Sequence, residues 1–411
     1  MKIKYTILLI FVSAFFSNAQ KILFDASKAQ MAGNADWIID ADTHNIFTSS
    51  GPVQSGGGTE SNPQRYPAPA QSGITATTTE SFWNGALSYW AIDCVKQGYI
   101  VETLPYNGQI TYGVSTNLQD LSNYKVFVVD EPNISFTPSE MNAIVNFVQN
   151  GGGLMMIADH TISDRNNDGI DSLVIWNDLM TSNTVQANPF GISFDTTDFS
   201  QTSTNVAALP TNPILHGSFG NVTKAQWSAG TSMTLNTTEN STVKGLIFKT
   251  GSSSTGLVNV MCASATYFNG KVVAIGDSSI PDDGTGDPND VLYDGYIADA
   301  SGNHQKLLMN AIIWLATTTL QNESFEDIKS TFVIVPNPAE GKILKGYFHN
   351  ATNSNSKLLI YDSLGREVMQ NQLEINTNNS FEIDCNRLNS GIYFAKIVSE
   401  SNSKTIKFSI Q

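Results

Sequence analysis

The sequence predicts a mixed α/β protein with a small all-β region at its C-terminus. Through the first three quarters of the chain, short apolar stretches alternate with amphipathic helical segments. This alternation is typical of a mostly parallel sheet with helices on both faces. Near the C-terminus, residues 357–361 and 392–398 instead alternate polar and apolar positions and are separated by turns, which indicates a small β-sandwich. The 411 residues suffice for two or three domains.

Four strands and two helices are predicted in the first half of the chain. The strands are residues 21–25, 99–104, 125–130 and 153–158. Residues 125–130 (KVFVVD) are apolar up to the final Asp, as expected of a strand buried on both faces. A helix is predicted over residues 79–98, because apolar residues recur there at helical spacing. A second helix begins at residues 137–140 (TPSE), a capping box with Pro at the first helical position, and ends at Gly151.

The second half is less regular. A short helix is predicted over residues 172–180, and several β-like pieces follow between residues 185 and 260. Residues 258–267 and 271–276 flank an Asn-Gly turn and form a predicted hairpin. Residues 304–316 carry an apolar stripe at helical spacing and predict a closing helix.

The N-terminus has the pattern of a signal peptide. Lys2 and Lys4 precede an apolar run over residues 7–16, and small residues up to Ala19 offer a cleavage site. The run is too short to anchor the chain in a membrane, and no other stretch is long and apolar enough to span one. We therefore expect residues 1–19 to be removed on export across the inner membrane.

Charge and cysteine content restrict the possible partners. Residues 20–318 hold 11 Lys and Arg against 27 Asp and Glu, a net charge of −16. Nucleic acid and anionic lipid are poor partners for such a segment, because phosphate binding needs clustered cations. No C-x-x-C motif occurs, so a thiolate zinc site is not expected. Cys94 and Cys262 either form a disulfide in an oxidising compartment or, as we favour, are buried as small apolar residues.

The C-terminal region carries an ordered set of motifs. The segment V-P-N-P begins at Val335, and Y-D-S-L-G-R, L-N-S-G-I-Y and a terminal K-T-I-K-F follow in order. With these motifs, residues 331–411 resemble the type A C-terminal sorting domain of type IX secretion cargo. The resemblance implies engagement with the type IX secretion machinery, passage through the periplasm and outer membrane, and a secreted or cell-surface location. The alternative is an ordinary immunoglobulin-like module that binds sugar or protein.

A second resemblance covers residues 21–318. It is carried by residues 151–160 (GGGLMMIADH) and 270–279 (GKVVAIGDSS), within the order of strands and helices given above. This segment resembles the class I glutamine-amidotransferase-like fold, in particular its trehalose-utilisation (ThuA-like) branch and related surface proteins. The resemblance implies a flavodoxin-like sheet over residues 20–318, followed by a linker at residues 319–330. The family's nucleophilic Cys is replaced by Asp159 and His160, so thiol-dependent glutamine hydrolysis is not expected.

Several predicted strands end in acidic residues. These are Asp25, Asp130 with Glu131, Asp159 and Asp277. Ligands bind beyond the carboxyl ends of the strands in open parallel sheets, so we expect these acids to meet there. Carboxylates beside an imidazole provide acid–base or metal chemistry. We therefore take His160, Asp25 and Asp277 as candidate catalytic residues, the alternative being that each Asp caps the following loop.

Two loops add candidate binding residues. Residues 32–45 contain three aspartates and one histidine close in sequence to Trp37. Asp36, Trp37 and His44 are candidate substrate-binding residues, with the Trp37 indole as a stacking platform. The alternative is a helix start with solvated acids.

Residues 164–171 resemble a calcium-binding loop, because oxygen ligands alternate before a Gly. The candidate ligands of a structural Ca²⁺ are Asp164, Asn166, Asp168 and Asp171. The usual bidentate Glu is missing, since Ile175 stands at its position, and the alternative is a polar surface loop.

Two functions follow from these patterns. The leading hypothesis is a secreted metal-assisted hydrolase that acts on extracellular carbohydrate or a related polymer, with a catalytic metal that the sequence does not specify. The competing hypothesis is a non-catalytic, calcium-stabilised module that binds glycan or serves at the cell surface. An enzyme needs His160 and carboxylates around one open site, whereas a binding module can use the same Asp side chains as caps.

Overall fold

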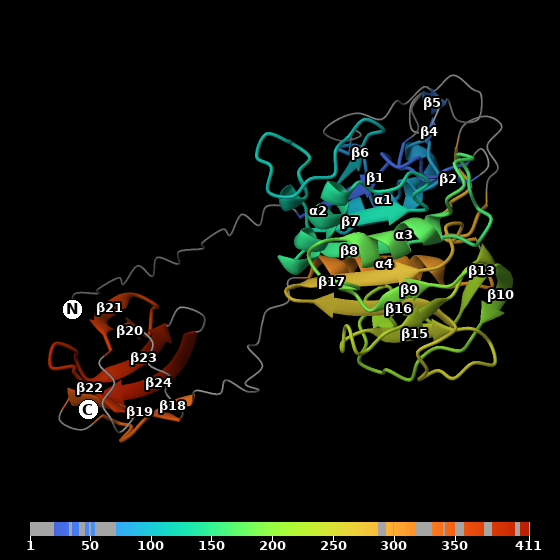
Figure 1. Ribbon diagram of the computed structural model, residues 1–411. Helices are drawn as coiled ribbons and strands as arrows, with labels where there is room; N and C mark the ends of the chain where they lie inside the picture. Colours follow the sequence, from blue (N-terminus) through green and yellow to red (C-terminus); the bar gives the residue numbers. More distant parts are fainter. Residues whose placement is uncertain are drawn as a thin grey trace, which may run out of the picture. The chain divides into compact units, whose positions relative to one another are not determined.

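The computed structural model divides the chain into two compact units, Met1–Leu320 and Gln321–Gln411 (Figure 1). Each unit is described by itself. The structure describes residues 20–32, 35–40, 46–48, 51–53, 71–286, 293–298, 300–317, 331–339, 342–349, 357–373, 380–398 and 403–410. No helix in these ranges has the length and apolar character needed to cross a membrane.

A nine-stranded mixed sheet forms the centre of the first unit. Its parallel half has the order β6 (Ile100–Leu104), β1 (Lys21–Asp25), β7 (Val126–Asp130), β8 (Gly153–Ile157), β17 (Gly270–Ile275). Numbered along the chain, this is the 2-1-3-4-5 order of doubly wound sheets. The other half is antiparallel and contains β16 (Val260–Tyr267), β14 (Met233–Leu235), β9 (Ile192–Phe194) and β15 (Lys244–Phe248). The prediction of a mostly parallel sheet is therefore confirmed for the strands that lie next to the acidic residues.

Four α-helices pack on this sheet in two pairs. They are α1 (Ser88–Lys96), α2 (Pro138–Gln149), α3 (Ser172–Ser182) and α4 (His304–Ala316). Helix α1 packs on α4, and α2 packs on α3. The capping box at Thr137 is confirmed, since its hydroxyl accepts from the Glu140 amide while the Glu140 carboxylate accepts from the Thr137 amide. Two 3-10 turns, η1 (Glu80–Phe82) and η2 (Leu121–Asn123), complete the helical elements among the described residues.

The prediction of a helix over residues 79–98 is wrong for the first half of that range. Only η1 forms there, and α1 begins at Ser88. Gly85 explains the break, because its backbone lies against Ile38 and Ile39 so closely that a Cβ would sit 2.4 Å from the Ile38 carbonyl oxygen. The apolar spacing across this segment comes from burial of side chains on both sides of the break, including Trp83 and Trp90.

The remaining small strands form two-stranded sheets around the first unit. They pair β10 (Phe199–Ser203) with β13 (Ala225–Gly230), β11 (His216–Gly217) with β12 (Gly220–Asn221), β2 (Met31–Ala32) with β3 (Ala35–Asp36), and β4 (Ile46–Thr48) with β5 (Gly51–Val53).

The second unit is an antiparallel β structure. One sheet has the order β18 (Thr331–Ile334), β19 (Ile343–His349), β22 (Ser380–Asp384), and the other β21 (Glu367–Gln372), β20 (Lys357–Asp362), β23 (Gly391–Val398), β24 (Ser403–Ile410). Both sheets contribute to one apolar core, with Leu344 and Phe381 from the first and Ile360 and Phe408 from the second. The prediction of a C-terminal all-β region is confirmed.

Candidate active site

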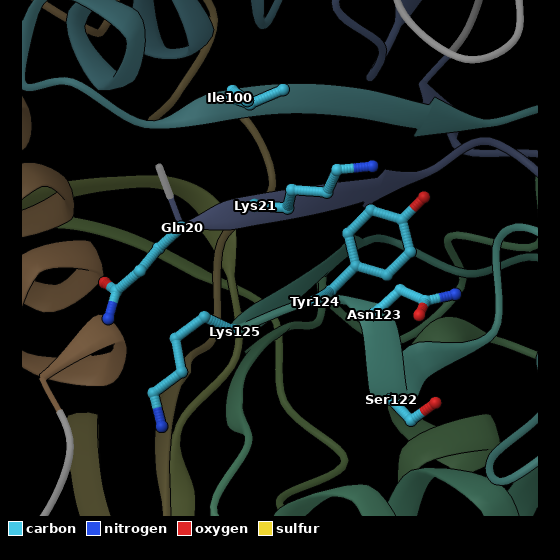
Figure 2. Close-up of a pocket in the computed structure, with 7 residues that line it drawn as sticks. All are labelled: Gln20, Lys21, Ile100, Ser122, Asn123, Tyr124 and Lys125. Carbon is cyan, nitrogen blue, oxygen red and sulfur yellow. The ribbon is translucent and has the colours of Figure 1, made fainter. Parts of the chain in front are cut away.

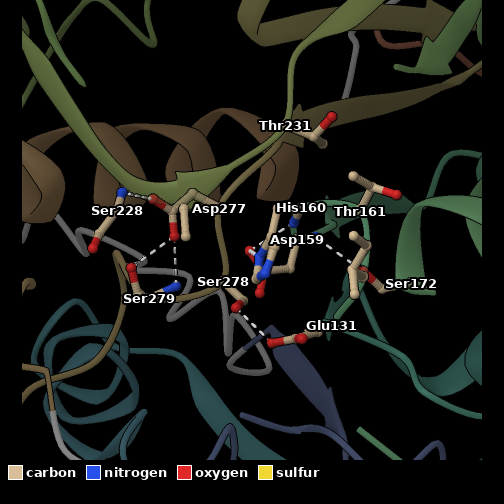
Figure 3. A network of polar contacts seen from close by, with 12 residues as sticks. Glu131, Asp159, His160, Thr161, Ser172, Ser228, Thr231, Asp277, Ser278 and Ser279 are labelled. Atoms are coloured by element: carbon tan, nitrogen blue, oxygen red, sulfur yellow. Dashed lines mark hydrogen bonds and ion pairs between the residues drawn. The ribbon is translucent and has the colours of Figure 1, made fainter. Parts of the chain in front are cut away.

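Four adjacent parallel strands bring acidic residues to one edge of the sheet. Asp25 ends β1 and Asp130 ends β7, while Asp159 and Asp277 each follow their strand, β8 and β17, by two residues. Each of these side chains belongs to a residue that is at most 3% exposed. We call the group formed by Asp130, Glu131, Asp159, His160 and Asp277 the acidic cluster. Figure 3 shows Glu131, Asp159, His160 and Asp277.

Glu131 lies at the centre of the acidic cluster. Its Oε2 accepts hydrogen bonds from Trp37 Nε1 at 2.7 Å and from Ser278 Oγ at 2.6 Å. Its backbone has φ of +39°, a left-handed conformation that is strained for Glu and recurs at functional sites. Burial raises the pKa of Glu131, the Asp159 charge adds to the rise, and the Arg165 guanidinium opposes it. The sequence marks Glu131 only as a neighbour of a strand end, so its central place was missed.

Arg165 joins two acids of the cluster. Its Nε donates to Glu131 Oε1 at 2.8 Å and its Nη2 donates to Asp159 Oδ2 at 2.7 Å. Charge-assisted bonds of this kind fix both partners in one geometry. Arg165 comes from the loop predicted to bind calcium, and the sequence gives no signal that it turns towards the strand ends.

His160 is the most accessible titratable member of the acidic cluster. Its Nδ1 lies 3.1 Å from Asp159 Oδ1, an ion pair when the imidazole is protonated, although the ring geometry does not make a hydrogen bond. Its side chain is 16% exposed against 5% for Asp159. The close Asp159 carboxylate raises the pKa of His160, and burial opposes that rise.

Asp277 is held by the loop that follows β17. Its Oδ1 accepts from the Ser279 amide at 2.9 Å and the Ser279 hydroxyl at 2.7 Å, and its Oδ2 accepts from the Ser228 amide (Figure 3). Burial raises the pKa of Asp277, and the Asp159 charge adds to the rise. The structure thus brings two of the three predicted catalytic residues, His160 and Asp277, to Asp159.

Asp25 lies at the same edge but is tied to its own loop. Its carboxylate accepts from the Ser27 amide and hydroxyl, at 3.0 and 2.7 Å, and from Gln30 Nε2 at 2.5 Å. Its charged neighbours are Lys28 and Glu140, not members of the acidic cluster, and burial raises its pKa to about 6. This is the capping arrangement that the sequence left open as the alternative.

Asp130 differs from every other acid at this edge. It is 1% exposed, and neither carboxylate oxygen has a hydrogen-bond partner. Burial raises the pKa of Asp130 well above its ordinary range, and the charges of Glu131, Asp159 and Asp277 add to the rise. A buried carboxyl without a hydrogen-bond partner is costly for stability.

The predicted substrate-binding residues are only partly placed. Trp37 is fully buried, and its indole donates to Glu131, so its ring is part of the support of the acidic cluster and not an open stacking surface. The backbone of Asp36 pairs with Met31 in the small sheet of β2 and β3. His44 lies outside the described residues.

The loop over residues 164–171 is closed by its own hydrogen bonds. Asp164 accepts from the amides of Asp168 and Gly169, at 3.1 and 2.7 Å. Asn166 Nδ2 donates to Asp168 Oδ2 at 3.0 Å, and Asp171 accepts from the Ile162 amide at 2.8 Å. Across the described part of the chain, no group of three or more His, Cys, Asp or Glu side chains is arranged to hold a metal ion.

The three cysteines are buried and unpaired in the described ranges. Cys94 lies in α1, and Cys262 lies in β16, opposite Ile275 of β17. Burial raises the pKa of both thiols, which disfavours the reactive thiolate.

A hollow of about 480 Å³ lies at the opposite, amino edge of the parallel strands (Figure 2). Lys21 and Ile100 line it from the starts of β1 and β6, and Lys125 from the residue before β7. Lys21 donates to Glu102 at 2.6 Å and Lys125 donates to the Gly151 carbonyl. The positive charges of this edge are therefore already matched by groups of the protein.

Comparison with known proteins identifies the second unit. Residues 333–411 match the family model of the secretion system C-terminal sorting domain. No curated protein sequence matches the chain.

Solved structures show only weak likeness to the chain. The N-terminal domain of mmIFT52 is 13% identical with a TM-score of 0.39, over 60% of this chain and 96% of that one. A putative ThuA-like protein from Parabacteroides merdae ATCC 43184 is 11% identical with a TM-score of 0.34, over 74% of this chain and 92% of that one. A DUF3244 family protein with an immunoglobulin-like β-sandwich from Bacteroides vulgatus ATCC 8482 is 17% identical with a TM-score of 0.16, over 18% and 79%. These scores carry no functional argument, so identification rests on the sorting domain: the chain is a secreted cargo of the type IX system.

Proposed function

We propose that the exported α/β unit, residues 20–318, is a hydrolase that acts on extracellular carbohydrate or a related polymer. The observation that carries the proposal is the contact between His160 and Asp159 at the carboxyl edge of the parallel strands. Perturbed pKa values in a group of acids and an imidazole are typical of acid–base sites. The proposal includes a glutamine-amidotransferase-like fold for this unit, which the 2-1-3-4-5 strand order supports. It also includes the type A class of the sorting domain, which the C-terminal motifs support.

In this proposal His160 is the acid–base group. Hydrolysis needs a proton for the leaving oxygen and a proton acceptor for the attacking water. Asp159 raises the pKa of His160 and so favours the protonated imidazole, whose Nε2–H can donate its proton to the leaving oxygen. Asp277, with a pKa that burial raises, is the proton acceptor, and Asp25 is the third proposed catalytic residue. Arg165 keeps Asp159 in place through both steps.

Metal assistance fits these residues poorly. The carboxylates of Asp25 and Asp277 each accept three hydrogen bonds from protein donors. Few lone pairs are left for a metal ion, so no step of the proposal passes through one. Hydrolysis that EDTA abolishes and a divalent ion restores would favour the metal-assisted form.

The test is hydrolysis of a panel of polysaccharides and esters by the full chain. His160→Ala should lower the rate by about 10²- to 10⁴-fold, the usual contribution of a general acid or base. His216→Ala is the matched control, because His216 is exposed in β11, outside the acidic cluster. A His160→Ala rate equal to the His216→Ala rate would overturn the role of His160.

A glycan-binding or cell-surface module without catalysis is the second candidate. The specific observation in its favour is that Asp25 and Asp277 cap their own loops. A folded wild-type chain that hydrolyses no member of the panel but is retained on one of the polysaccharides would favour this candidate.

Structural calcium is proposed at residues 164–171 in either case. Asp164, Asn166, Asp168 and Asp171 supply the oxygen atoms that Ca²⁺ prefers. Ca²⁺ at about a hundred times its dissociation constant should stabilise the chain by about 2.7 kcal/mol, measured by urea unfolding. Asp168→Asn should reduce this gain, and Asp178→Asn, on the surface of α3, should not; an equal response to Mg²⁺ or none to Ca²⁺ would contradict the proposal.

A further inference from the structure

One surface of the sorting domain exposes apolar side chains between unpaired lysines. It is the face of the four-stranded sheet that points away from the core, and we call it the outer face. Its members on β20, β23 and β24 are Lys357, Leu359, Tyr361, Ile392, Phe394, Lys396 and Lys407. At the β21 side, the exposed Glu367 is opposite Tyr361. Ile392 is 48% exposed and Phe394 is 37% exposed, whereas the alternate residues of β23 point into the core.

Strand register places these residues side by side. Phe394 on β23 is opposite Tyr361 on β20 and Lys407 on β24. Lys396, two residues along the same strand, is opposite Leu359. Residues opposite one another on one face of an antiparallel sheet have neighbouring side chains, so the apolar and cationic groups form one continuous surface.

Charge distinguishes this surface from the outside of the other sheet. Val333 and Tyr347 are opposite each other on β18 and β19 and are 42% and 46% exposed, so apolar side chains occur there too. There, however, Lys345 forms an ion pair with Glu382 at 2.8 Å. On the outer face, Lys396 and Lys407 make no ion pair with any acid in the described ranges.

We propose that the outer face is the surface by which the sorting domain docks on the type IX secretion machinery. Exposed apolar side chains grouped on one face mark interaction sites, and unpaired lysines around them select an acidic partner. The docking partner therefore presents apolar groups flanked by carboxylates. The proposal rests on the sorting function of residues 333–411 and is independent of the chemistry of the first unit.

The experiment follows export of the full chain from a cell that has the type IX system. Ile392→Ser with Phe394→Ser should lower the exported fraction at least about tenfold and leave the chain in the periplasm, since a few central apolar contacts carry most of the binding free energy of an interface. Lys396→Glu with Lys407→Glu should have a similar effect. Val333→Ser with Tyr347→Ser is the matched control, with the same kind of exposed cross-strand pair, and should export normally.

Each other result has a distinct meaning. Normal export of both outer-face variants, or failure of the control variant alone, would overturn the proposal. Thermal unfolding of the purified variants separates lost docking from lost folding, because loss of export with a wild-type melting profile requires a surface role. If Ile392→Ser with Phe394→Ser instead dissociates a dimer, the occupant is a second copy and the proposal is wrong. Export of a chain lacking residues 321–411 would contradict the sorting function itself.

Discussion

The two edges of the parallel sheet differ in how they accommodate buried charge. At the amino edge, Lys125 donates to a backbone carbonyl, and Lys271 donates to the carbonyls of Trp314 and Thr317 at 3.0 and 2.9 Å. At the carboxyl edge, several acids lie within range of one another, and Arg165 is bonded to two of them. Asp130 there has no hydrogen-bond partner within the described part of the chain.

We interpret the amino edge as structural and the carboxyl edge as the proposed functional one. At the amino edge, backbone carbonyls accept hydrogen bonds from Lys125 and Lys271. The carboxyl edge keeps several acids in an unfavourable environment, which folding alone would not select. The strained backbone of Glu131 supports the same interpretation, because backbone strain of this kind clusters at functional sites.

The pH dependence of stability should show the largest effect. Burial raises the pKa of Asp282 from 3.8 to about 7 and that of Asp25 from 3.8 to about 6. An acid whose pKa is raised by folding binds more protons in the native state, so stability is present below pH 4 and is lost as pH rises towards 7. We expect the melting temperature of the α/β unit to fall on the order of 10 °C between pH 5 and pH 7.5.

At the amino edge, the contribution of buried charge to stability should change with pH in the opposite direction and over a separate pH range. Burial lowers the pKa of Lys271 from 10.5 to about 8, with the charge of Lys125 adding to the shift. The native state then binds fewer protons than the unfolded chain between pH 8 and pH 10.5, so this contribution to stability rises with pH. A melting temperature that rises steadily from pH 5 to pH 7.5 would contradict the account of the acidic edge.

Removal of Arg165 should have the next largest effect. Arg165→Met leaves Glu131 and Asp159 buried without their cation and should destabilise the chain by about 3–5 kcal/mol in urea unfolding. Lys21→Met is the control at the opposite edge. The Lys21 side chain is 36% exposed, and in the variant Glu102 still accepts a hydrogen bond from the Tyr124 hydroxyl. We therefore expect the free energy of unfolding to fall by about 1 kcal/mol. Equal losses for the two variants would remove the distinction between the edges.

The sequence predicts the frame of this site better than its centre. The strand over residues 21–25 and the helix over residues 304–316 are confirmed with the predicted bounds, because burial and helical spacing are local signals. The positions of Asp130 and Asp159 at strand ends follow from the same signals. Gly85 shows the limit within an element, since the break in the helix over residues 79–98 depends on contact with a distant loop.

The contacts of Glu131 could not be predicted, because its partners are far away in sequence. Trp37 is 94 residues away, Arg165 is 34 and Ser278 is 147. Arg165 lies in residues 164–171, which the alternating oxygen-bearing side chains predict to be a calcium-binding loop. That pattern gives no indication of the contacts of Arg165 itself. Side chains that meet only through the tertiary fold leave no periodicity in the sequence.

Neutralising Asp130 should have the smallest effect and a distinctive sign. Asp130→Asn removes a carboxyl whose charged form burial disfavours, so the variant should be more stable than the wild type at pH 8, on the order of 2 kcal/mol, and nearly equal to it at pH 3.

Asp120→Asn is the matched control for this variant, because its acid is satisfied. Burial alone would raise the pKa of Asp120. Five hydrogen bonds from residues such as Thr111 and Ser122 outweigh burial and lower this pKa to about 2. Asp120→Asn should therefore lose stability at pH 8, the opposite sign to Asp130→Asn. A stability loss in both variants would mean that Asp130 has a partner in solution, and the carboxyl edge would then be as well satisfied as the amino edge. A gain for Asp130→Asn that accompanies weaker hydrolysis or glycan retention would show that the cost of this carboxyl is kept for function.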